Sequence, residues 1–382
     1  MNRLAVVVPK PAAEATIAAL AAEGVYDDAR RVVEHDADRV ELPVRAAPRE
    51  TAFESLVTQA DPETRIAGLA DVLRERGWDE ADIERAPSSW AVVGDVVLVE
   101  LPDDCPDPAA LGAALLDLHG GADTVFAREG VAGAQREPRG TVIAGSPDTE
   151  TIHTEHGTKY ALDLAEVMFS PGNQAERVRM GEVVAPGERV LDMFAGVGYF
   201  ALPMARAGAD VVAVEANPTA FRYLAENVQL NDVADRVDCV LGDCREYRAE
   251  APVDRVVMGY YDSVGGHRAG PTDGRSRGTT NGEAVSHAGP TDGEGPTENE
   301  GPSENADGRD PGYLDAALDA IADDGVVHVH TTSPEGDFPD RDEARVRAVA
   351  ADRGATVAAV ETRVVKSHSP GVVHGVLDVR LG

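Results

Sequence analysis

Lysine is nearly absent from this chain of 382 residues: only Lys10, Lys159 and Lys366 occur, so arginine supplies 35 minus 3, or 32, of the basic residues. Aspartate and glutamate together number 68, and the formal net charge is -33. Such an acidic, lysine-poor composition indicates a protein kept soluble in concentrated salt by self-repelling carboxylates. The alternative is a chaperone or a binder of basic partners, and the lack of any run of five acidic residues argues against it.

The negative charge does not exclude a nucleic acid as partner. A strongly acidic protein should repel RNA in dilute buffer. In molar salt the Debye length falls to about 3 Å, so the net field is screened and only nearby arginines matter. We therefore keep an RNA substrate among the possible partners.

Cysteine, aromatic residues and long apolar runs are also scarce. The three cysteines, Cys105, Cys239 and Cys244, lack metal-binding spacing, and their odd number does not suit a disulfide framework. The first apolar run ends at Pro9, which predicts neither a signal peptide nor a membrane span. His153 and His156 have no third ligand in view, so no metal is expected. These features predict a cytoplasmic protein without metal and without a membrane contact.

The most informative stretch runs from Val190 to Glu215. An apolar run ending in Asp192 leads into a turn with Gly196 and Gly198, then a helix-like segment, then a second apolar run ending in Glu215. This pattern predicts one βαβ unit. Asp192, Gly196 and Gly198 are predicted to bind the cofactor, because the glycines would let backbone approach a ligand. Glu215 is placed to accept two ribose hydroxyls, as in nucleoside sites at the carboxyl edge of a parallel sheet.

The next strand end supports that interpretation. Gly242, Asp243 and Cys244 follow an apolar run from Val237 to Leu241, and Asp243 is placed to accept from an adenine amino group. The turn reads A-G-V-G-Y and not G-x-G-x-x-G, which favours S-adenosylmethionine over a dinucleotide. A glycine turn required only for steric reasons is the alternative.

The predicted fold class is α/β: a Rossmann-like class I S-adenosylmethionine-dependent transferase domain preceded by small α+β domains. Predicted domains are a small α/β domain over 1-86, an α+β linker domain over 87-168 and the catalytic domain over 169-382. The stretch 265-312 is rich in Gly, Pro, Thr, Ser, Asp, Glu and Asn and repeats Ala-Gly-Pro-Thr-Asp-Gly, so it predicts a disordered insertion.

Further candidate residues flank the βαβ unit. Ser170 is expected to cap a helix beginning near Asn173, and Ser170 and Arg177 to grip the methionine end of the cofactor, Arg177 through its carboxylate. A capped helix with a surface charge pair is the alternative. Four more residues are candidates for binding a planar base, although core aromatics and satisfied sheet histidines are the alternatives: Tyr260, Tyr261, His328 and His330.

With these residues in view, the chain resembles the archaeal and eukaryotic tRNA-modifying family that contains the guanine-37 N1-methyltransferases and the wybutosine-synthesis aminocarboxypropyltransferases. The resemblance covers roughly Trp90 to the C-terminus without the insertion. Cys244 departs from the Asn often found at its position. The shared marks are Thr151-Ile-His, Phe169-Ser-Pro, Glu176-Arg177, Asp192 to Gly198, Glu215 to Pro218 and Gly242-Asp243.

The resemblance favours the aminocarboxypropyltransferase branch. Phe169-Ser-Pro-Gly-Asn173 is similar to its F-S-x-G-N, where the methyltransferases carry F-S-P-R, and Met258-Gly-Tyr260 replaces the methyltransferase N-L-P. It implies cofactor contacts by Ser170, Arg177, Glu215, Asp243 and Cys244. The implied reaction moves the 3-amino-3-carboxypropyl group of S-adenosylmethionine to C7 of 4-demethylwyosine at position 37, in the anticodon loop of tRNA(Phe), and releases 5'-methylthioadenosine.

Two alternatives stay open. One is a methyltransferase of the same fold acting on guanine-37 or its tricyclic derivative, which the missing N-L-P disfavours. The other is a non-catalytic RNA-binding module with a vestigial cofactor fold. No residue is identified as a general base, and the oligomeric state is not predicted.

Overall fold

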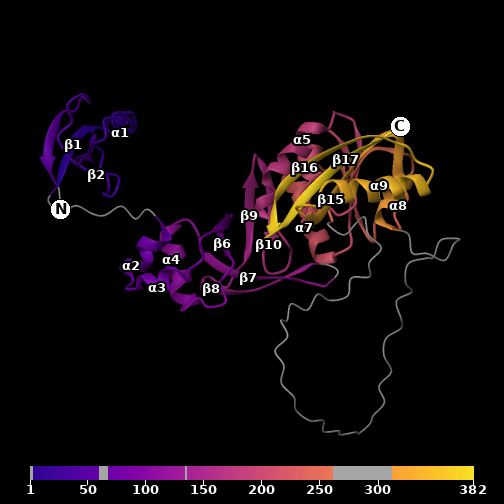
Figure 1. Ribbon diagram of the computed structural model, residues 1–382, viewed down its shortest axis with the longest axis horizontal. Helices are drawn as coiled ribbons and strands as arrows, with labels where there is room; N and C mark the ends of the chain where they lie inside the picture. The colour runs from indigo at the N-terminus through magenta and orange to yellow at the C-terminus, as the bar shows by residue number, and fades with distance from the viewer. Residues whose placement is uncertain (1–2, 60–67, 134–135, 261–311) are drawn as a thin grey trace, which may run out of the picture. The chain divides into compact units, whose positions relative to one another are not determined.

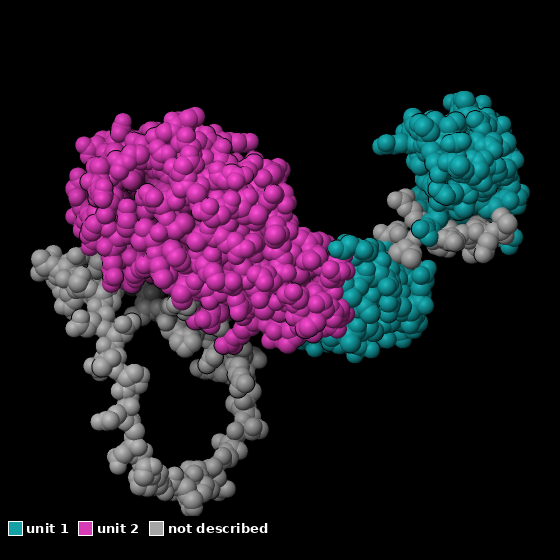
Figure 2. All heavy atoms as spheres, turned by 180° about the vertical axis from the view of Figure 1, so that it is seen from behind, with its two compact units in different colours: residues 1–87, 102–121 teal, residues 88–101, 122–382 magenta. Residues whose placement is uncertain are grey.

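The computed structural model describes residues 3-59, 68-133, 136-260 and 312-382. Tyr261 and the predicted insertion, apart from Gly312, lie outside the described residues. The chain divides into two compact units, one of residues 1-87 with 102-121 and one of residues 88-101 with 122-382 (Figure 2).

The first unit contains a small antiparallel sheet of order β2-β3-β1-β4. Its strands are β1 (Leu4–Pro9), β2 (Val33–Glu34), β3 (Arg39–Pro43) and β4 (Ser55–Thr58), and its helix is α1 (Ala13–Ala22). Apolar residues that alternate along β1 and β3 meet Leu20 of α1 in one core, as period-two strand patterning requires. The unit also contains α2 (Leu69–Glu75), α3 (Glu80–Ile83) and α4 (Pro108–Leu118).

The second unit begins with a sheet of order β5-β6-β7-β8, formed by β5 (Trp90–Val93), β6 (Val96–Val99), β7 (Thr124–Ala132) and β8 (Glu137–Gly145). β5 and β6 form a hairpin that turns at Gly94, with Val93 paired to Val96. A separate hairpin follows, of β9 (Glu150–Glu155) and β10 (Thr158–Asp163).

The predicted Rossmann-like fold is confirmed by a seven-stranded sheet of order β13-β12-β11-β14-β15-β17-β16. The first five strands are parallel and β17 runs antiparallel to both of its neighbours. From β11 the chain adds β12 and β13 on one side of the sheet and then β14 and β15 on the other side. The strand order therefore reverses at β11, and open α/β sheets bind ligands at such a point. The strands are β11 (Arg189–Asp192), β12 (Asp210–Glu215), β13 (Val237–Leu241), β14 (Val253–Met258), β15 (Ile321–Pro334), β16 (Val357–Ser369) and β17 (Val372–Leu381).

Helices connect and cover these strands (Figure 1). They are α5 (Gln174–Val183), α6 (Ala201–Arg206), α7 (Pro218–Leu230), α8 (Tyr313–Ala320) and α9 (Asp340–Asp352). Val190 and Val257 belong to one apolar cluster, whereas their chain neighbours Leu191 and Val256 belong to another. Successive strand residues point to opposite faces, so each face of the sheet has its own core.

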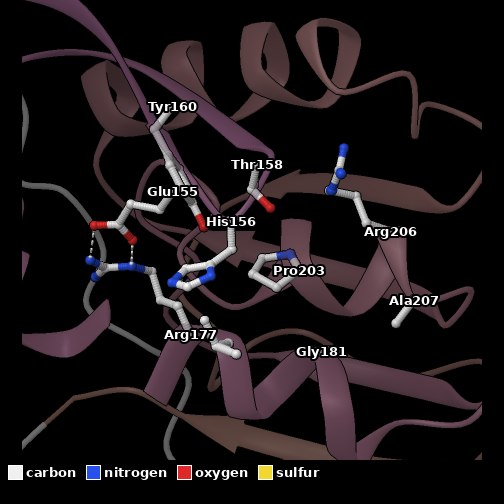
Figure 3. A pocket seen from close by; sticks show the side chains of 10 residues that line it. Glu155, His156, Thr158, Tyr160, Arg177, Gly181, Pro203, Arg206 and Ala207 are labelled. Carbon is white, nitrogen blue, oxygen red and sulfur yellow. Dashed lines mark hydrogen bonds and ion pairs between the residues drawn. The ribbon is translucent and has the colours of Figure 1, made fainter. Parts of the chain in front are cut away.

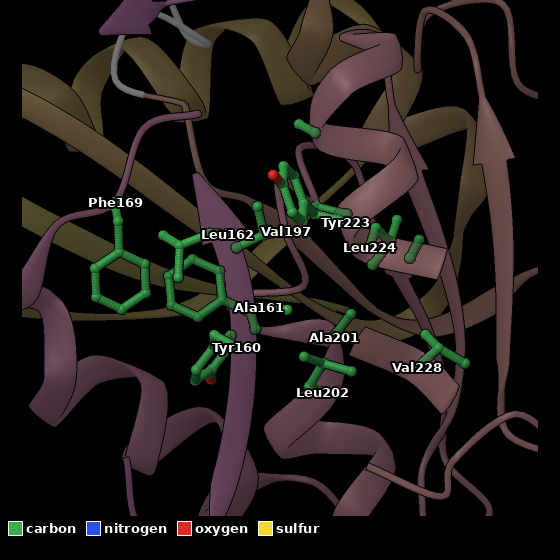
Figure 4. Close-up of a cluster of buried hydrophobic side chains, with 14 of the residues drawn as sticks. Tyr160, Ala161, Leu162, Phe169, Val197, Ala201, Leu202, Tyr223, Leu224 and Val228 are labelled. Carbon is green, nitrogen blue, oxygen red and sulfur yellow. The ribbon is translucent and has the colours of Figure 1, made fainter. Parts of the chain in front are cut away.

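The first of these clusters draws on several segments that are distant in the sequence (Figure 4). It joins Tyr160 and Leu162 of β10, Phe169, Leu202 of α6 and Leu224 of α7, and each is at most 2% exposed. Polar contacts reinforce this packing, because the buried Asn227 of α7 donates to the carbonyl oxygens of Ala161 and Val197. The hairpin β9-β10 is thereby fixed beside the glycine turn.

Candidate functional site

A cavity of about 360 Å3 lies at the carboxyl ends of β11, β12, β13 and β14. This volume is within the range typical of small-molecule sites. Six of the eight predicted cofactor residues line it: Ser170, Arg177, Gly196, Glu215, Asp243 and Cys244. The cavity walls also include Arg136, Met168, Asn173, Phe194, Tyr199, Phe200, Asn217, Arg245, Gly259, Tyr260 and Tyr313.

The glycine turn brings backbone donors to Glu215. Gly196 donates its N–H to Glu215 Oε2 at 2.7 Å, and Asn217 donates to Oε1 at 2.7 Å. Gly196 has φ +56, and a Cβ there would lie 2.2 Å from the Tyr199 ring, so only glycine fits without movement. Burial raises the pKa of Glu215. Each carboxylate oxygen keeps a further lone pair for a ligand hydroxyl.

Asp192 and Gly198 are outside the cavity lining. Asp192 is fully buried, accepts from Phe194 N–H at 3.3 Å, and has its pKa raised by burial to about 7. Gly198 has φ +102 and packs toward Leu202 and Leu224 in the core. Both residues stand next to the turn, where they contribute to its shape and packing.

Asp243 and Cys244 face the cavity from the end of β13. Burial alone would raise the pKa of Asp243, but hydrogen bonds from Arg245 outweigh it and the pKa is lowered. Arg245 Nη2 lies 2.6 Å from Asp243 Oδ2. Cys244 is buried, and burial raises the pKa of its thiol, so it is a neutral thiol at the cavity wall.

Ser170 does not cap α5, contrary to the sequence-based expectation. A 3-10 turn, Pro171–Asn173, lies between Ser170 and α5, and no side-chain cap bond is made at either position. The Ser170 hydroxyl instead accepts from Lys366 Nζ of β16 at 2.7 Å. The extra turn separates the hydroxyl from the first free amides of α5, which a cap must reach.

Arg177 forms a buried ion pair that the sequence did not suggest. Its Nε and Nη2 donate to the two carboxylate oxygens of Glu155 at 2.6 and 2.7 Å, and its Nη1 donates to the Ser170 carbonyl at 3.0 Å. The side chains of Arg177 and Glu155 are 3% and 5% exposed. The same pair lines a second pocket of about 240 Å3 that includes His156, Thr158 and Arg206 (Figure 3).

Aromatic rings gather at one end of the cavity. Tyr260, just after β14, stacks on Phe194 with ring centroids 5.3 Å apart and planes 21° apart. Tyr313 lies 6.1 Å from Tyr260, and the Arg136 guanidinium lies 5.8 Å from the Tyr260 centroid. Tyr261 lies outside the described residues. Flat rings and a guanidinium at a cavity wall are suited to stacking against a planar base.

His328 and His330 are placed inside the sheet and not in the cavity wall. His328 Nδ1 lies 2.6 Å from Asp378 Oδ1, and His330 Nδ1 lies 3.0 Å from His374 Nε2. Burial is the largest cause that lowers the pKa of His328, and it lowers that of His330 to about 3. The His330 ring is 5.1 Å from that of Phe200, which lines the cavity.

Sequence reasoning missed Arg136, Phe194, Tyr313 and Lys366. Phe194 was within the quoted motif and its aromatic character was a usable signal. The other three come from segments far away in the sequence, and no local pattern marks them.

Across the part of the chain that the structure describes, no group of three or more His, Cys, Asp or Glu side chains is arranged to hold a metal ion. No helix in that part is long and apolar enough to cross a membrane.

Comparisons with known proteins agree with this geometry. Residues 151-267 match the family model of the TRM5/TYW2 methyltransferase domain, and residues 69-149 match that of the TYW2 N-terminal domain. The tRNA(Phe) (4-demethylwyosine(37)-C(7)) aminocarboxypropyltransferase of Pyrococcus horikoshii is 31% identical over 83% of this chain and 99% of its own length.

Two other proteins are also similar. The tRNA (guanine(37)-N(1))-methyltransferase Trm5b of Pyrococcus abyssi is 30% identical over 77% of this chain and 75% of its own. The crystal structure of P. horikoshii TYW2 in complex with MeSAdo aligns with a TM-score of 0.60 and 29% identity, over 82% of this chain and 97% of that one.

Proposed function

The chain belongs to the TRM5/TYW2 family, and from that premise we propose that it is a tRNA aminocarboxypropyltransferase. It transfers the 3-amino-3-carboxypropyl group of S-adenosylmethionine to C7 of 4-demethylwyosine at position 37 of tRNA(Phe), in the biosynthesis of wyosine derivatives. The second product is 5'-methylthioadenosine. The match of residues 69-149 to the TYW2 N-terminal domain supports this branch over the methyltransferases.

The cavity fits the donor in size and polarity. We assign Glu215 to the ribose hydroxyls and Asp243 to the adenine amino group, since both carboxylates line the cavity at adjacent strand ends. Gly196 lines the cavity beside them, and its N–H holds the Glu215 carboxylate in place. Ser170, Arg177 and Cys244 complete the assigned wall.

Bound S-adenosylmethionine supplies a sulfonium with three activated carbons, and the carbon aligned with the nucleophile reacts. In the transfer a bond forms between C7 and the γ carbon, the γ carbon–sulfur bond breaks with its electron pair passing to sulfur, and the C7 proton leaves. The chain's task is to orient the two reactants, and Tyr260, stacked on Phe194, is assigned to the base.

The residues at the end of β14 are the observation that favours aminocarboxypropyl transfer over methyl transfer. There Gly259 and Tyr260 line the cavity and present a ring, where a methyltransferase acting on a base nitrogen needs a polar acceptor for the proton of the amine. A ring carbon loses its proton, to water, only after the new bond has formed, so its attack does not need that acceptor. The methyltransferase of P. abyssi remains a similar protein, so methyl transfer is the reaction to exclude by experiment.

The test is a transfer assay in molar potassium chloride with hypomodified tRNA(Phe), using donor labelled either in the methyl or in the carboxyl carbon. Carboxyl label in the tRNA, with methylthioadenosine released, is the expected result. Methyl label in the tRNA would mean that the reaction is methylation. A tRNA whose position 37 carries unmodified guanine is the control and should receive no carboxyl label.

The setting of the reaction is part of the proposal. The anticodon loop of tRNA(Phe) is the proposed contact, because position 37 lies there. The acidic, lysine-poor composition fits an archaeal cytoplasm rich in salt, where screening reduces repulsion between a chain of charge -33 and RNA.

A further inference from the structure

The donor's amino-acid end carries a carboxylate, and Arg177 is poorly placed to supply the positive charge that balances it. Three of its donor nitrogen atoms are already used, two on Glu155 and one on the Ser170 carbonyl. With Glu155 it forms a buried pair without net charge. An arriving carboxylate therefore meets a neutralised guanidinium, and another cation has to balance it.

Lys366 is such a cation. Its Nζ donates to Ser170 Oγ at 2.7 Å, Ser170 lines the cavity, and among the described residues Lys366 forms no ion pair. Burial is the main cause that lowers its pKa, followed by repulsion from Arg128, Arg177 and Arg136, and Glu100 acts in the opposite direction. Arg128 is paired with Glu100 and Arg177 with Glu155, so the charges of these two guanidinium groups are already balanced.

Gly172 leaves room for this lysine. A Cβ at Gly172 would lie 3.2 Å from Lys366 Cδ and 3.3 Å from Nζ, so a larger residue would push the side chain away. The same short segment, Pro171–Asn173, is the turn that separates Ser170 from α5. The turn therefore leaves room for Lys366 to reach Ser170, and Ser170 lines the cavity.

Asn173 provides an independent sign of a ligand. It lines the cavity, and its Oδ1 is buried yet accepts no hydrogen bond from any residue that the structure describes. Leaving a buried acceptor without a donor is unfavourable, so such atoms usually have a partner. An ammonium group offers three donors and suits this oxygen.

We propose that Lys366, together with the Ser170 hydroxyl, binds the α-carboxylate of the transferable aminocarboxypropyl group, and that Asn173 Oδ1 accepts from its α-ammonium. This inference rests on the proposed function, because it assumes the same donor in the same cavity. It assigns the subsite that fixes the chain to be transferred, and so the carbon presented to the base.

A pair of neutral ligands tests the subsite. S-adenosylhomocysteine and 5'-methylthioadenosine share the nucleoside and a thioether sulfur, and only the first carries the amino-acid chain. In the full-length protein, Lys366→Met and Asn173→Ala should each weaken S-adenosylhomocysteine binding about 10-fold or more, as expected for lost charge-assisted hydrogen bonds. Binding of methylthioadenosine, measured by calorimetry, should change less than about 2-fold. Lys366→Arg should restore part of the affinity.

Lys159→Met is the matched control, because it removes one of the three lysines from an exposed position on β10 and should leave both affinities unchanged. Equal weakening of both ligands, or no change for either, would overturn the inference. So would a Lys366→Met variant that loses tRNA affinity alone, since Lys366 would then serve an RNA phosphate. Wild-type protein that binds neither S-adenosylhomocysteine nor S-adenosylmethionine would instead contradict the proposed function.

Discussion

At the scale of single residues, Asp192 links the sheet to the glycine turn from a position that no solvent reaches. It is fully buried at the end of β11, and its Oδ2 has no hydrogen-bond partner among the described residues. Burial is the main reason that its pKa is raised to about 7, and the nearby Glu215 raises it further. The carboxyl group is therefore substantially protonated in the folded protein at pH values where an exposed aspartate is ionised.

A pH dependence of stability follows from Asp192. Between about pH 4 and 7 the folded carboxyl holds a proton that the unfolded chain has lost, so its contribution is present at low pH and is lost as pH rises toward 7. The slope is at most about 1.4 kcal/mol per pH unit. Asp192→Asn should flatten this part of the profile, as measured by denaturant unfolding at several pH values. Asp238→Asn, at an exposed position of β13, should leave the profile parallel to that of the wild type, and a parallel profile for Asp192→Asn would contradict the prediction.

At the scale of elements, the Arg177–Glu155 pair joins α5 to β9. Glu155→Gln would leave a buried guanidinium without its counter-charge and should destabilise the fold by about 3–5 kcal/mol. The double variant Glu155→Met with Arg177→Met should be less destabilised than the sum of the two single changes. A double-mutant cycle of unfolding free energies measures this coupling.

An exposed pair provides the comparison. Arg222 and Glu166 are 3.7 Å apart and more than half exposed, so Glu166→Gln should change stability by less than about 1 kcal/mol. Similar effects at the buried and exposed pairs would mean that burial does not govern the first one.

Elements with a strong local pattern could be predicted from the sequence. The βαβ unit through Glu215 could be predicted because turn glycines and apolar runs are local properties of the sequence. The cap at Ser170 was wrong because a 3-10 turn and α5 have nearly the same start signals. Lys366 and Arg136 could not be found, since the fold alone brings Arg136 to the cavity wall and Lys366 to Ser170.

At the scale of the whole molecule, a net charge of -33 should make stability depend on salt. Repulsion among carboxylates opposes the compact state, and raising potassium chloride from about 0.1 to 1 M shortens the Debye length from about 10 to 3 Å. The melting temperature should rise by several degrees in calorimetry. Sucrose does not screen charge. An equal rise of the melting temperature when sucrose replaces the added salt would therefore mean that solvent exclusion, and not screening, causes the effect.

The contact between Tyr260 and Tyr313 also bears on how long the segment between them can be. Their rings are 6.1 Å apart, although positions 261 to 312 separate them, so the two ends of that connection are fixed side by side by the fold. The composition predicts that this segment is a disordered insertion, and for such a segment the loop-closure entropy grows only with the logarithm of length, so each halving saves about 0.6 kcal/mol. Replacing residues 264-308 by a linker of a few glycines and serines should therefore raise stability by about 1–2 kcal/mol and leave S-adenosylhomocysteine binding unchanged, a result that lost affinity would contradict. Because this cost changes so slowly with length, we expect insertions or deletions of only a few residues in this segment to alter the folding free energy very little.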